Sequence, residues 1–218
     1  HAHEPQFISP QFNHTAPPGD HQVYGDSMLE QDYHVGRVMD AIRNSALKDN
    51  TVVFFASDNG PSLISLQYGG SPGKLKCGKS TTWEGGHRVP SMVWGPNVGV
   101  PQGVVSSEIV SNLDWMPTML SMARISLPEG VKLDGVDVSD LLLGKTITSP
   151  RDTMFYYGRQ GTLNAVRHGR YKMHYFTSGW GGSPVELCGP KDYIEHNPPL
   201  LFDLELDAFE NNSISDTT

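Results

Sequence analysis

The chain has 218 residues, 24 of them acidic and 16 basic, and its formal net charge at pH 7 is -8. Hydrophobic residues make up 37% of the sequence, which is enough for a packed core and excludes wholesale disorder. No run approaches the roughly 20 apolar residues of a membrane-spanning helix, so we expect no membrane span. The acidic balance argues against a nucleic-acid partner, because such proteins usually carry a basic surface.

Both ends of the sequence are irregular. Residue 1 is His rather than Met, no signal peptide is visible, and the tail after Glu210 is polar, so we expect the chain to be part of a longer protein. Asn-x-Ser/Thr triplets begin at Asn13 and Asn211. These two asparagines are candidate glycosylation sites, and they favour a secretory route.

The first predicted helix starts near Asp26 and ends at residues 49–50. Ser27 and Glu30 have the spacing of a capping box at its beginning. Apolar residues then recur at helical spacing and predict a face that packs on the core. They are Met28, Val35, Met39, Ile42 and Ala46.

A buried strand is predicted directly after this helix. Residues 51–56 form a continuous apolar run, typical of a strand buried on both faces. A helix followed by such a strand is half of a parallel α/β unit, whose ligands gather beyond the carboxyl ends of the strands. Asp58 and Asn59 stand at that end. Their oxygens suit Ca²⁺ or Mg²⁺, although the same pair also favours an ordinary turn.

A Gly-rich loop is predicted over residues 62–86. Four basic residues in and just after this loop form a local cationic cluster in an otherwise acidic chain. The cluster consists of Lys74, Lys76, Lys79 and Arg88. Residues 73–80 match the string of a nucleotide-binding P-loop, but the strand before it and the helix after it are missing, so we predict no such site. The ammonium of Lys79 is nevertheless a good donor to a tetrahedral oxyanion.

The character of the sequence changes near Pro150. Before it, we expect a strand at 89–94, a helix or helix pair at 112–123 and a short helix at 139–143. After it, short β-rich segments separated by Gly turns predict an antiparallel meander. Its strands are expected at 154–157, 163–166, 171–176 and 199–204. We therefore expect two domains, residues 1–150 and 151–218.

The cysteines and the terminal histidines are further candidates. Cys77 and Cys188 are too few for a disulfide scaffold, and the residues alone leave one bridge and two free thiols equally open. His1 and His3 lie in an irregular segment, where histidine acts as a general acid or base near neutrality or is simply a solvated end. No role is assigned to His87, His168, His174 or His196.

Taken together, these segments resemble the sulfatases, in particular the arylsulfatase A and N-acetylgalactosamine-6-sulfatase branch. The matching strings occur in the family's order across nearly the whole chain. They are HAHEPQF (1–7), GDS (25–27), SDNGP (57–61), CGKSTTWEGG (77–86) followed by Arg88, Asp114 with Pro117-Thr118, LDG (133–135) and PLLFD (199–203). The resemblance implies an α/β fold like that of alkaline phosphatase, with an incomplete large α/β domain followed by a smaller antiparallel-sheet domain.

The resemblance also implies roles for particular residues. Asp58 and Asn59 match the family's later pair of Ca²⁺ ligands, with Mg²⁺ the less favoured ion, and Lys79 matches the lysine that holds the sulfate. His3 matches the histidine that contacts the sulfate and donates a proton to the leaving alcohol. His1 matches a nearby histidine, which we place on the substrate side without fixing its role.

The sequence departs from the family pattern at one essential point. Sulfatases carry a Cys-x-Pro-Ser-Arg string whose cysteine becomes formylglycine, the nucleophile, and this chain has no such string. We expect it in an N-terminal part outside the chain, so the chain alone should be inactive. Cys77 and Cys188 fall where arylsulfatase A-like enzymes place a disulfide, and the resemblance therefore favours a bridge.

The function implied by the resemblance is that of a Ca²⁺-dependent sulfatase acting on sulfated lipids, glycans or aryl esters in a lysosomal or secreted setting. Whether it forms a homo-oligomer is left open. One alternative is a phosphoesterase of the same superfamily, against which the string at 77–86 argues. The other is a non-catalytic extracellular protein that keeps the fold for binding a matrix or a partner, which a full-length sequence without Cys-x-Pro-Ser-Arg would favour.

Overall fold

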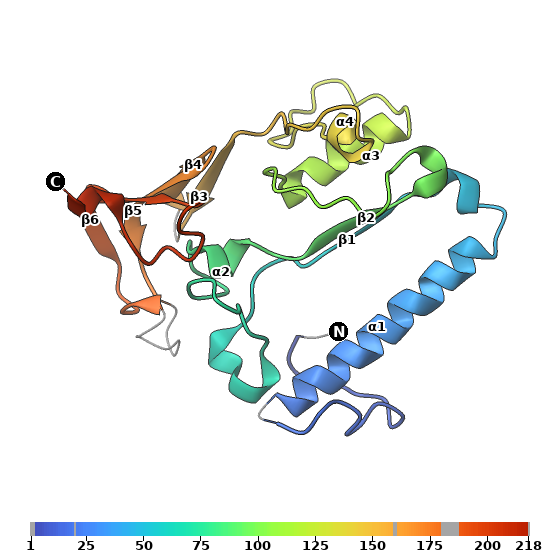
Figure 1. The fold of residues 1–218 in the computed structure, drawn as a ribbon, viewed down its shortest axis with the longest axis horizontal. Helices are drawn as coiled ribbons and strands as arrows, with labels where there is room; N and C mark the ends of the chain where they lie inside the picture. Colours follow the sequence, from blue (N-terminus) through green and yellow to red (C-terminus); the bar gives the residue numbers. More distant parts are fainter. Residues whose placement is uncertain (1–2, 20, 159–160, 180–187, 218) are drawn as a thin grey trace.

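The computed structural model describes residues 3–19, 21–158, 161–179 and 188–217, and two groups of elements divide them (Figure 1). The first group contains α1 (Gln22–Arg43), β1 (Val53–Ala56), α2 (Glu84–His87), β2 (Ser91–Trp94), α3 (Trp115–Met122) and α4 (Ser139–Leu142). The second contains β3 (Thr153–Tyr157), β4 (Leu163–His168), β5 (Tyr171–Thr177) and β6 (Ile194–Asp203). Short 3-10 turns complete the chain: η1 (Lys48–Asn50), η2 (Leu63–Tyr68), η3 (Pro96–Val98), η4 (Asn112–Asp114) and η6 (Ile214–Thr217).

The strands of the second group pair in chain order, and every pairing is antiparallel. The predicted meander is therefore confirmed. Alternation along β5 places Lys172 and His174 on one face of the sheet, and both side chains are completely buried there. Helix α2 lies beside this sheet, whereas α1 lies at the opposite side of the molecule (Figure 1).

Helix α1 begins earlier than predicted, and two of its acidic residues bind the preceding loop and do not cap the helix. It starts at Gln22 and ends at Arg43, so Ser27 and Glu30 lie inside the helix and form no capping box. Asp26 instead accepts the backbone N–H groups of residues 14, 15 and 16 at 2.8, 2.9 and 2.7 Å. Glu30 accepts the N–H of Ser9 at 2.9 Å. The two carboxylates hold the preceding loop against the helix.

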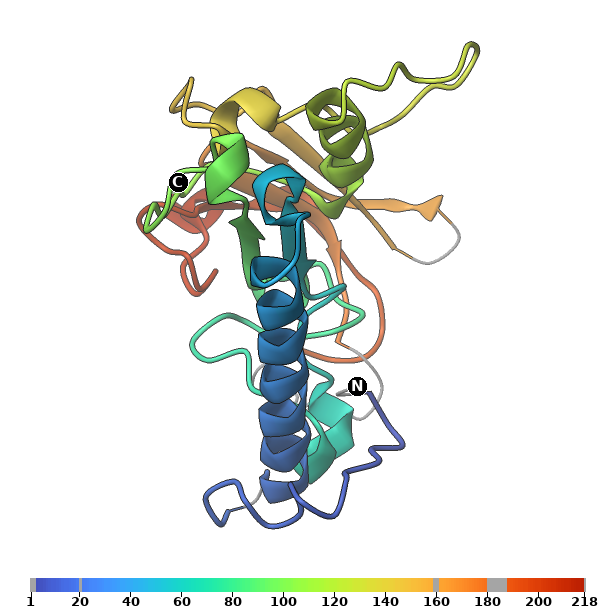
Figure 2. The same cartoon turned by 90° about the vertical axis from the view of Figure 1, so that its right-hand side faces the viewer.

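The apolar stripe of α1 does not face a core in the described structure. Met28 is 36% exposed and Val35 is 37% exposed, and Asp26 and Ser27 are the buried residues of the helix. Among the described elements, η2 is the main neighbour of α1, and Figure 2, which faces the right-hand side of Figure 1, shows the helix running in front of the other elements. The prediction of a core-facing stripe is wrong here, because no described element covers that face.

Strand β1 lies where it was predicted, but it pairs with a different kind of partner. It pairs with β2 in an antiparallel register, with Val53 opposite Trp94 and Ala56 opposite Ser91. Its residues are only partly buried. The parallel partner that the helix–strand order predicted is therefore not found among the described strands. The turn that carries Asp58 and Asn59 still follows the end of β1.

A buried aspartate joins the first group of elements to the start of β3. Asp114 accepts the N–H groups of Ser111 and Val136 at 2.8 and 2.9 Å, and it pairs with the guanidinium of Arg151. A Cβ on Gly135 would lie 2.0 Å from the carbonyl oxygen of Leu113, so only glycine permits this approach. These family-like residues hold the scaffold together and lie outside the candidate site.

Candidate active site

A hollow of about 400 Å³ lies between the two groups of elements. Asp58 and Asn59 line it from the turn after β1. The segment that leads into α2 and the sheet β3–β6 with its flanking loops supply the other walls. Their lining residues are Ser80, Thr81, Thr82, Gly86 and His87 on the first side, and Tyr157, Gly158, Asn164, Ser178, Lys191 and Tyr193 on the second. A smaller hollow beside α1 contains none of the predicted site residues.

The turn after β1 and the loop that carries Lys79 are fixed directly to each other. The N–H of Lys79 donates to the carbonyl oxygen of Pro61, and the N–H of Gly60 donates to that of Gly86, each at 2.9 Å. A Cβ on Gly60 would lie 1.8 Å from the carbonyl oxygen of Gly85. Glycine at position 60 is therefore required for this contact. The contact fixes the turn that carries Asp58 against the loop that carries Lys79.

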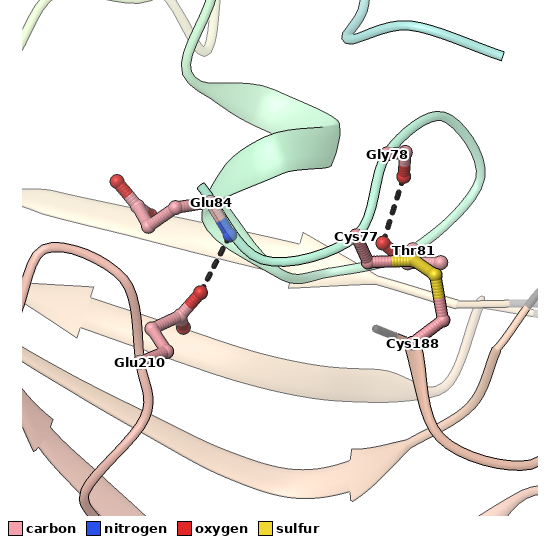
Figure 3. Close-up of a disulfide and its surroundings, with 6 residues drawn as sticks. All are labelled: Cys77, Gly78, Thr81, Glu84, Cys188 and Glu210. Carbon is pink, nitrogen blue, oxygen red and sulfur yellow. Dashed lines mark hydrogen bonds between the residues drawn. A yellow bond between two sulfur atoms is a disulfide. The ribbon is translucent and has the colours of Figure 1, made fainter. Parts of the chain in front are cut away.

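Left-handed backbone and a disulfide shape the loop on either side of Lys79. Cys77 has φ 57° and Ser80 has φ 71°, a conformation that costs L-residues roughly 1–2 kcal/mol each. Such strain clusters at ligand-binding sites. Cys77 is bonded to Cys188, which confirms the bridge that the resemblance favoured, and the hydroxyl of Thr81 donates to the carbonyl oxygen of Gly78 at 2.8 Å (Figure 3).

The structure brings some of the predicted site residues together. Asp58 and Asn59 line the hollow, and the half-buried Lys79 immediately precedes the lining residue Ser80. His3 is exposed, its ring Nδ1 lies 2.6 Å from the carbonyl oxygen of Glu4, and it is not among the lining residues. His1 lies outside the described residues. The roles of these side chains stay predictions, as does glycosylation at Asn13 and Asn211, which are both exposed.

Two oxygen donors are too few for a complete metal site. Within residues 3–19, 21–158, 161–179 and 188–217, no three His, Cys, Asp or Glu side chains cluster so that they could hold a metal. The carboxylate of Asp58 and the amide oxygen of Asn59 are of the hard type that Ca²⁺ prefers, but Ca²⁺ takes six to eight such ligands. The pair fits part of a calcium site.

Beneath the loop, four buried ionisable groups connect α2, β5 and the C-terminal segment. The ammonium of Lys172 lies 2.9 Å from Glu84 Oε1 and 3.1 Å from Glu210 Oε1. The other oxygen of Glu210 accepts the N–H of Glu84 at 2.6 Å (Figure 3). His174 Nε2 lies 2.7 Å from Glu210 Oε1. All four residues are at most 2% exposed, so we call them the buried ionic cluster.

The buried ionic cluster shifts the pKa values of its members. Burial alone would raise the pKa of Glu210, but the Lys172 ammonium, His174 and the Glu84 amide outweigh it and lower that pKa to about 2. Burial lowers the pKa of His174, which therefore donates its Nε2–H to Glu210 as a neutral ring. The two carboxylates overcome the effect of burial on Lys172 and raise its pKa.

Acid should therefore destabilise the fold in two stages. In the unfolded chain, His174 takes up a proton below its usual pKa of 6.5, whereas folded His174 does not. Unfolded Glu210 likewise takes up a proton below its usual pKa of 4.5, where folded Glu210 is still ionised. Both effects remove stability as the pH falls. We expect the urea midpoint to fall between about pH 6.5 and 4.5 and again below it, and Glu210→Gln to weaken the second stage. Glu205→Gln, which alters an exposed carboxylate, should keep the wild-type profile; an unchanged profile for Glu210→Gln would contradict this account.

The residues of the predicted cationic cluster differ in their surroundings. The ammonium of Lys76 lies 4.0 Å from the centre of the Trp83 ring and donates to the carbonyl oxygen of Glu210 at 3.0 Å. Lys74 and Arg88 are exposed and do not line the hollow. Lys76 therefore serves the contact between the loop and the C-terminal segment, and a single cationic cluster formed by all four residues stays a prediction.

Sequence reasoning missed several residues of the hollow. His87 lines it and contacts the ring of Tyr156, with 4.8 Å between the centroids. The surrounding protein and the Lys172 ammonium lower the pKa of His87 to about 4, although its side chain keeps an exposed face. The only sequence signal was its position directly after the family-like string at 77–86. Asn164 had no signal, because a polar residue in a strand is usually read as solvent-facing.

The α/β elements followed by the antiparallel sheet form an alkaline-phosphatase-like fold. The family model "Sulfatase" matches residues 1–125, and the model "C-terminal region of aryl-sulfatase" matches residues 149–218. The chain therefore belongs to the sulfatase family.

Individual relatives agree with this assignment. Arylsulfatase A from Bos taurus is 41% identical over 226 residues, covering 100% of this chain and 43% of that protein. N-acetylgalactosamine-6-sulfatase from Canis lupus familiaris is 40% identical over 229 residues, covering 98% and 42%. The crystal structure of PsFucS1 sulfatase from Pseudoalteromonas sp. superposes with a TM-score of 0.85 at 26% identity, covering 97% of this chain and 42% of that one. The chain thus spans about two fifths of the length of these relatives. No helix in the described parts of the chain is both long and apolar enough to cross a bilayer.

Proposed function

We propose that the full-length protein containing this chain hydrolyses sulfate esters. One observation carries the proposal: Asp58 and Asn59 line the same hollow as the loop that carries Lys79, and two backbone hydrogen bonds fix the turn and the loop together. Membership of the sulfatase family supports it. A carboxylate and an amide that line the hollow suit a metal ion, and a lysine next to the lining residue Ser80 would suit the negatively charged end of a sulfate ester.

Each candidate residue of the chain would have its own role in such a reaction. Asp58 and Asn59 would hold Ca²⁺, or less favourably Mg²⁺, which when bound polarises a sulfate oxygen as a Lewis acid. Lys79 would donate to a sulfate oxygen and neutralise charge that develops in the transition state. His3, with His1 on the substrate side, would protonate the oxygen of the leaving alcohol. His3 does not line the hollow in this structure, and its role as proton donor is a prediction.

The remaining parts of the proposal concern the whole protein. The nucleophile would be a formylglycine in a part of the protein outside this chain, and the residues of this chain would hold the sulfate ester for it. Residues 1–150 would form the C-terminal half of the large domain, and residues 151–218 the smaller domain. The disulfide and the exposed triplets at Asn13 and Asn211 favour a lysosomal or secreted protein. Its substrate is a sulfated small molecule, lipid or glycan.

A comparison of the full-length protein with the chain alone tests this proposal. The full-length protein should hydrolyse 4-nitrophenyl sulfate faster than 4-nitrophenyl phosphate, lose activity with a chelator and regain it with Ca²⁺. The 218-residue chain should show no turnover, because its described residues hold only part of a metal site and the sequence holds no formylglycine string. A preference for the phosphate ester would favour the phosphoesterase, and no ester hydrolysis by the full-length protein would favour the non-catalytic binder.

A further inference from the structure

The oxygen of a buried amide that lines the hollow has no hydrogen-bond partner among the described residues. Asn164 is 3% exposed and lines the hollow together with Asp58 and Asn59. Its Nδ2 lies 3.3 Å from the hydroxyl of Tyr193, but its Oδ1 has no partner among the described residues. A buried polar atom left unpaired costs roughly 1–3 kcal/mol, so native proteins rarely keep one without a reason. A ligand group that enters the hollow would satisfy it.

The local backbone keeps this amide open to the hollow. The register of β3 and β4 shifts so that Tyr156 lies opposite Ala165 and Tyr157 opposite Leu163, which leaves Asn164 without an opposite residue. Such bulges re-aim side chains next to active sites. A Cβ on Gly158 would lie 2.3 Å from Asn164 Nδ2 and 2.3 Å from the Tyr193 hydroxyl. Any larger residue at 158 would therefore fill the space in front of the amide.

The rest of the lining combines polar groups with two tyrosine rings. Its described side chains carry hydroxyl, amide, imidazole, ammonium and carboxylate groups, and none is aliphatic. A sterol or alkyl alcohol would remove water from these polar groups without replacing its hydrogen bonds. An alcohol that carries several hydroxyl groups would instead find partners on several walls. The lining therefore matches a carbohydrate better than a lipid or a plain aryl group.

We propose that Asn164 determines specificity by accepting a hydrogen bond from a hydroxyl of a sulfated sugar, beside the ester that is cleaved. This inference rests on the proposed function and narrows its substrate class to carbohydrate sulfates. Tyr193, which bonds the other end of the amide, holds the acceptor oxygen toward the substrate. The next residue, Ala165, is paired with both neighbouring strands, opposite Tyr156 on β3 and His174 on β5, which anchors the bulge that carries the amide.

The test uses the full-length protein and two kinds of substrate. A panel of monosulfated hexoses and N-acetylhexosamines is compared with 4-nitrophenyl sulfate and a sterol sulfate. We expect the best sugar sulfate to have the highest kcat/KM. Asn164→Ala should lower kcat/KM for that sugar by about tenfold or more and change it less than about twofold for 4-nitrophenyl sulfate. The deoxy sugar sulfate that lacks the bonded hydroxyl should be equally poor for both proteins.

Each outcome decides the question. Equal losses on sugar and aryl sulfates, or a wild-type preference for the sterol sulfate, would overturn the role of Asn164 while leaving sulfate-ester hydrolysis in place. If the wild-type protein cleaves no sulfate ester, the proposed function fails and the inference fails with it. If Asn164→Ala does not fold, Asn164→Ser and the deoxy series on wild-type protein answer the same question. A full set of deoxy sugars hydrolysed as well as the parent would then count against the hydrogen bond.

Discussion

Replacement of Lys79 by alanine in the full-length protein should lower kcat for 4-nitrophenyl sulfate by about 100-fold or more, the loss seen when one oxyanion donor is removed. The loop that carries Lys79 is fixed by the disulfide between Cys77 and Cys188 and by the bond from its own N–H to Pro61. Truncation of the side chain leaves both constraints intact. The loss should therefore appear in turnover, with little change in the melting temperature.

Lys74 provides a matched control for this experiment. It is an exposed lysine five residues earlier in the same loop, whereas Lys79 is half-buried and directly precedes the lining residue Ser80. Lys74→Ala should keep kcat within about twofold of wild type, because exposed charges contribute little at a distance in salt. An unchanged kcat for Lys79→Ala would remove Lys79 from the site. Equal losses for both variants would indicate a general electrostatic effect.

Replacement of Lys172 by methionine should destabilise the protein by about 3–5 kcal/mol, because it removes the ammonium that both buried carboxylates share and leaves them only one cation, Arg167, 3.8 Å from Glu84. Glu84 and Glu210 both lie within 3.1 Å of the Lys172 ammonium, and none of the three is more than 2% exposed. Methionine keeps the length of the side chain, so the change tests charge more than volume. Urea denaturation followed by tryptophan fluorescence would measure it; Trp83, whose ring centroid lies 4.4 Å from that of His174, is one of the four tryptophans that contribute.

An exposed ion pair gives the contrast. Lys145 lies 2.9 Å from Asp140, as close as Lys172 lies to Glu84, but the Lys145 side chain is 63% exposed. Lys145→Met should change the unfolding free energy by less than about 1 kcal/mol. Addition of Glu210→Gln to Lys172→Met should recover part of the loss, since it removes one uncompensated charge. Equal effects of Lys172→Met and Lys145→Met would show that burial does not govern these pairs.

The buried ionic cluster also explains how the C-terminal sheet supports the hollow. Glu84 begins α2, and the same short helix supplies Gly86 and His87 to the lining. Lys172 on β5 and Glu210 on the C-terminal segment clamp Glu84 through its side chain and its N–H. Loss of the clamp is expected to loosen the segment that carries Lys79 as well as the interface beneath it.

Several parts of the fold were predictable from local sequence. The short β-rich segments separated by Gly turns after Pro150 predicted the meander, and the polar residues after the apolar run at 51–56 predicted the turn that bears Asp58 and Asn59. The pairing of β1 with β2 was not predictable, since an apolar run does not state the direction of its partner. The stripe on α1 was equally ambiguous, because helical spacing shows which residues share a face but not what covers that face.

The sequence by itself determined the candidate chemistry of this protein: a carboxylate–amide pair after a strand, a lysine in a Gly-rich loop and two cysteines placed as in a known family. Only the tertiary structure decided which charges neutralise one another. Lys172 and Glu84 are 88 residues apart in sequence, and Glu84 and Glu210 are 126 apart. A lysine or a histidine in a strand looks solvent-facing in isolation. The structure shows instead that Lys172 and His174 are buried. A charged side chain is stable in the low-dielectric interior only beside a partner of opposite charge, and here residues distant in sequence supply that partner.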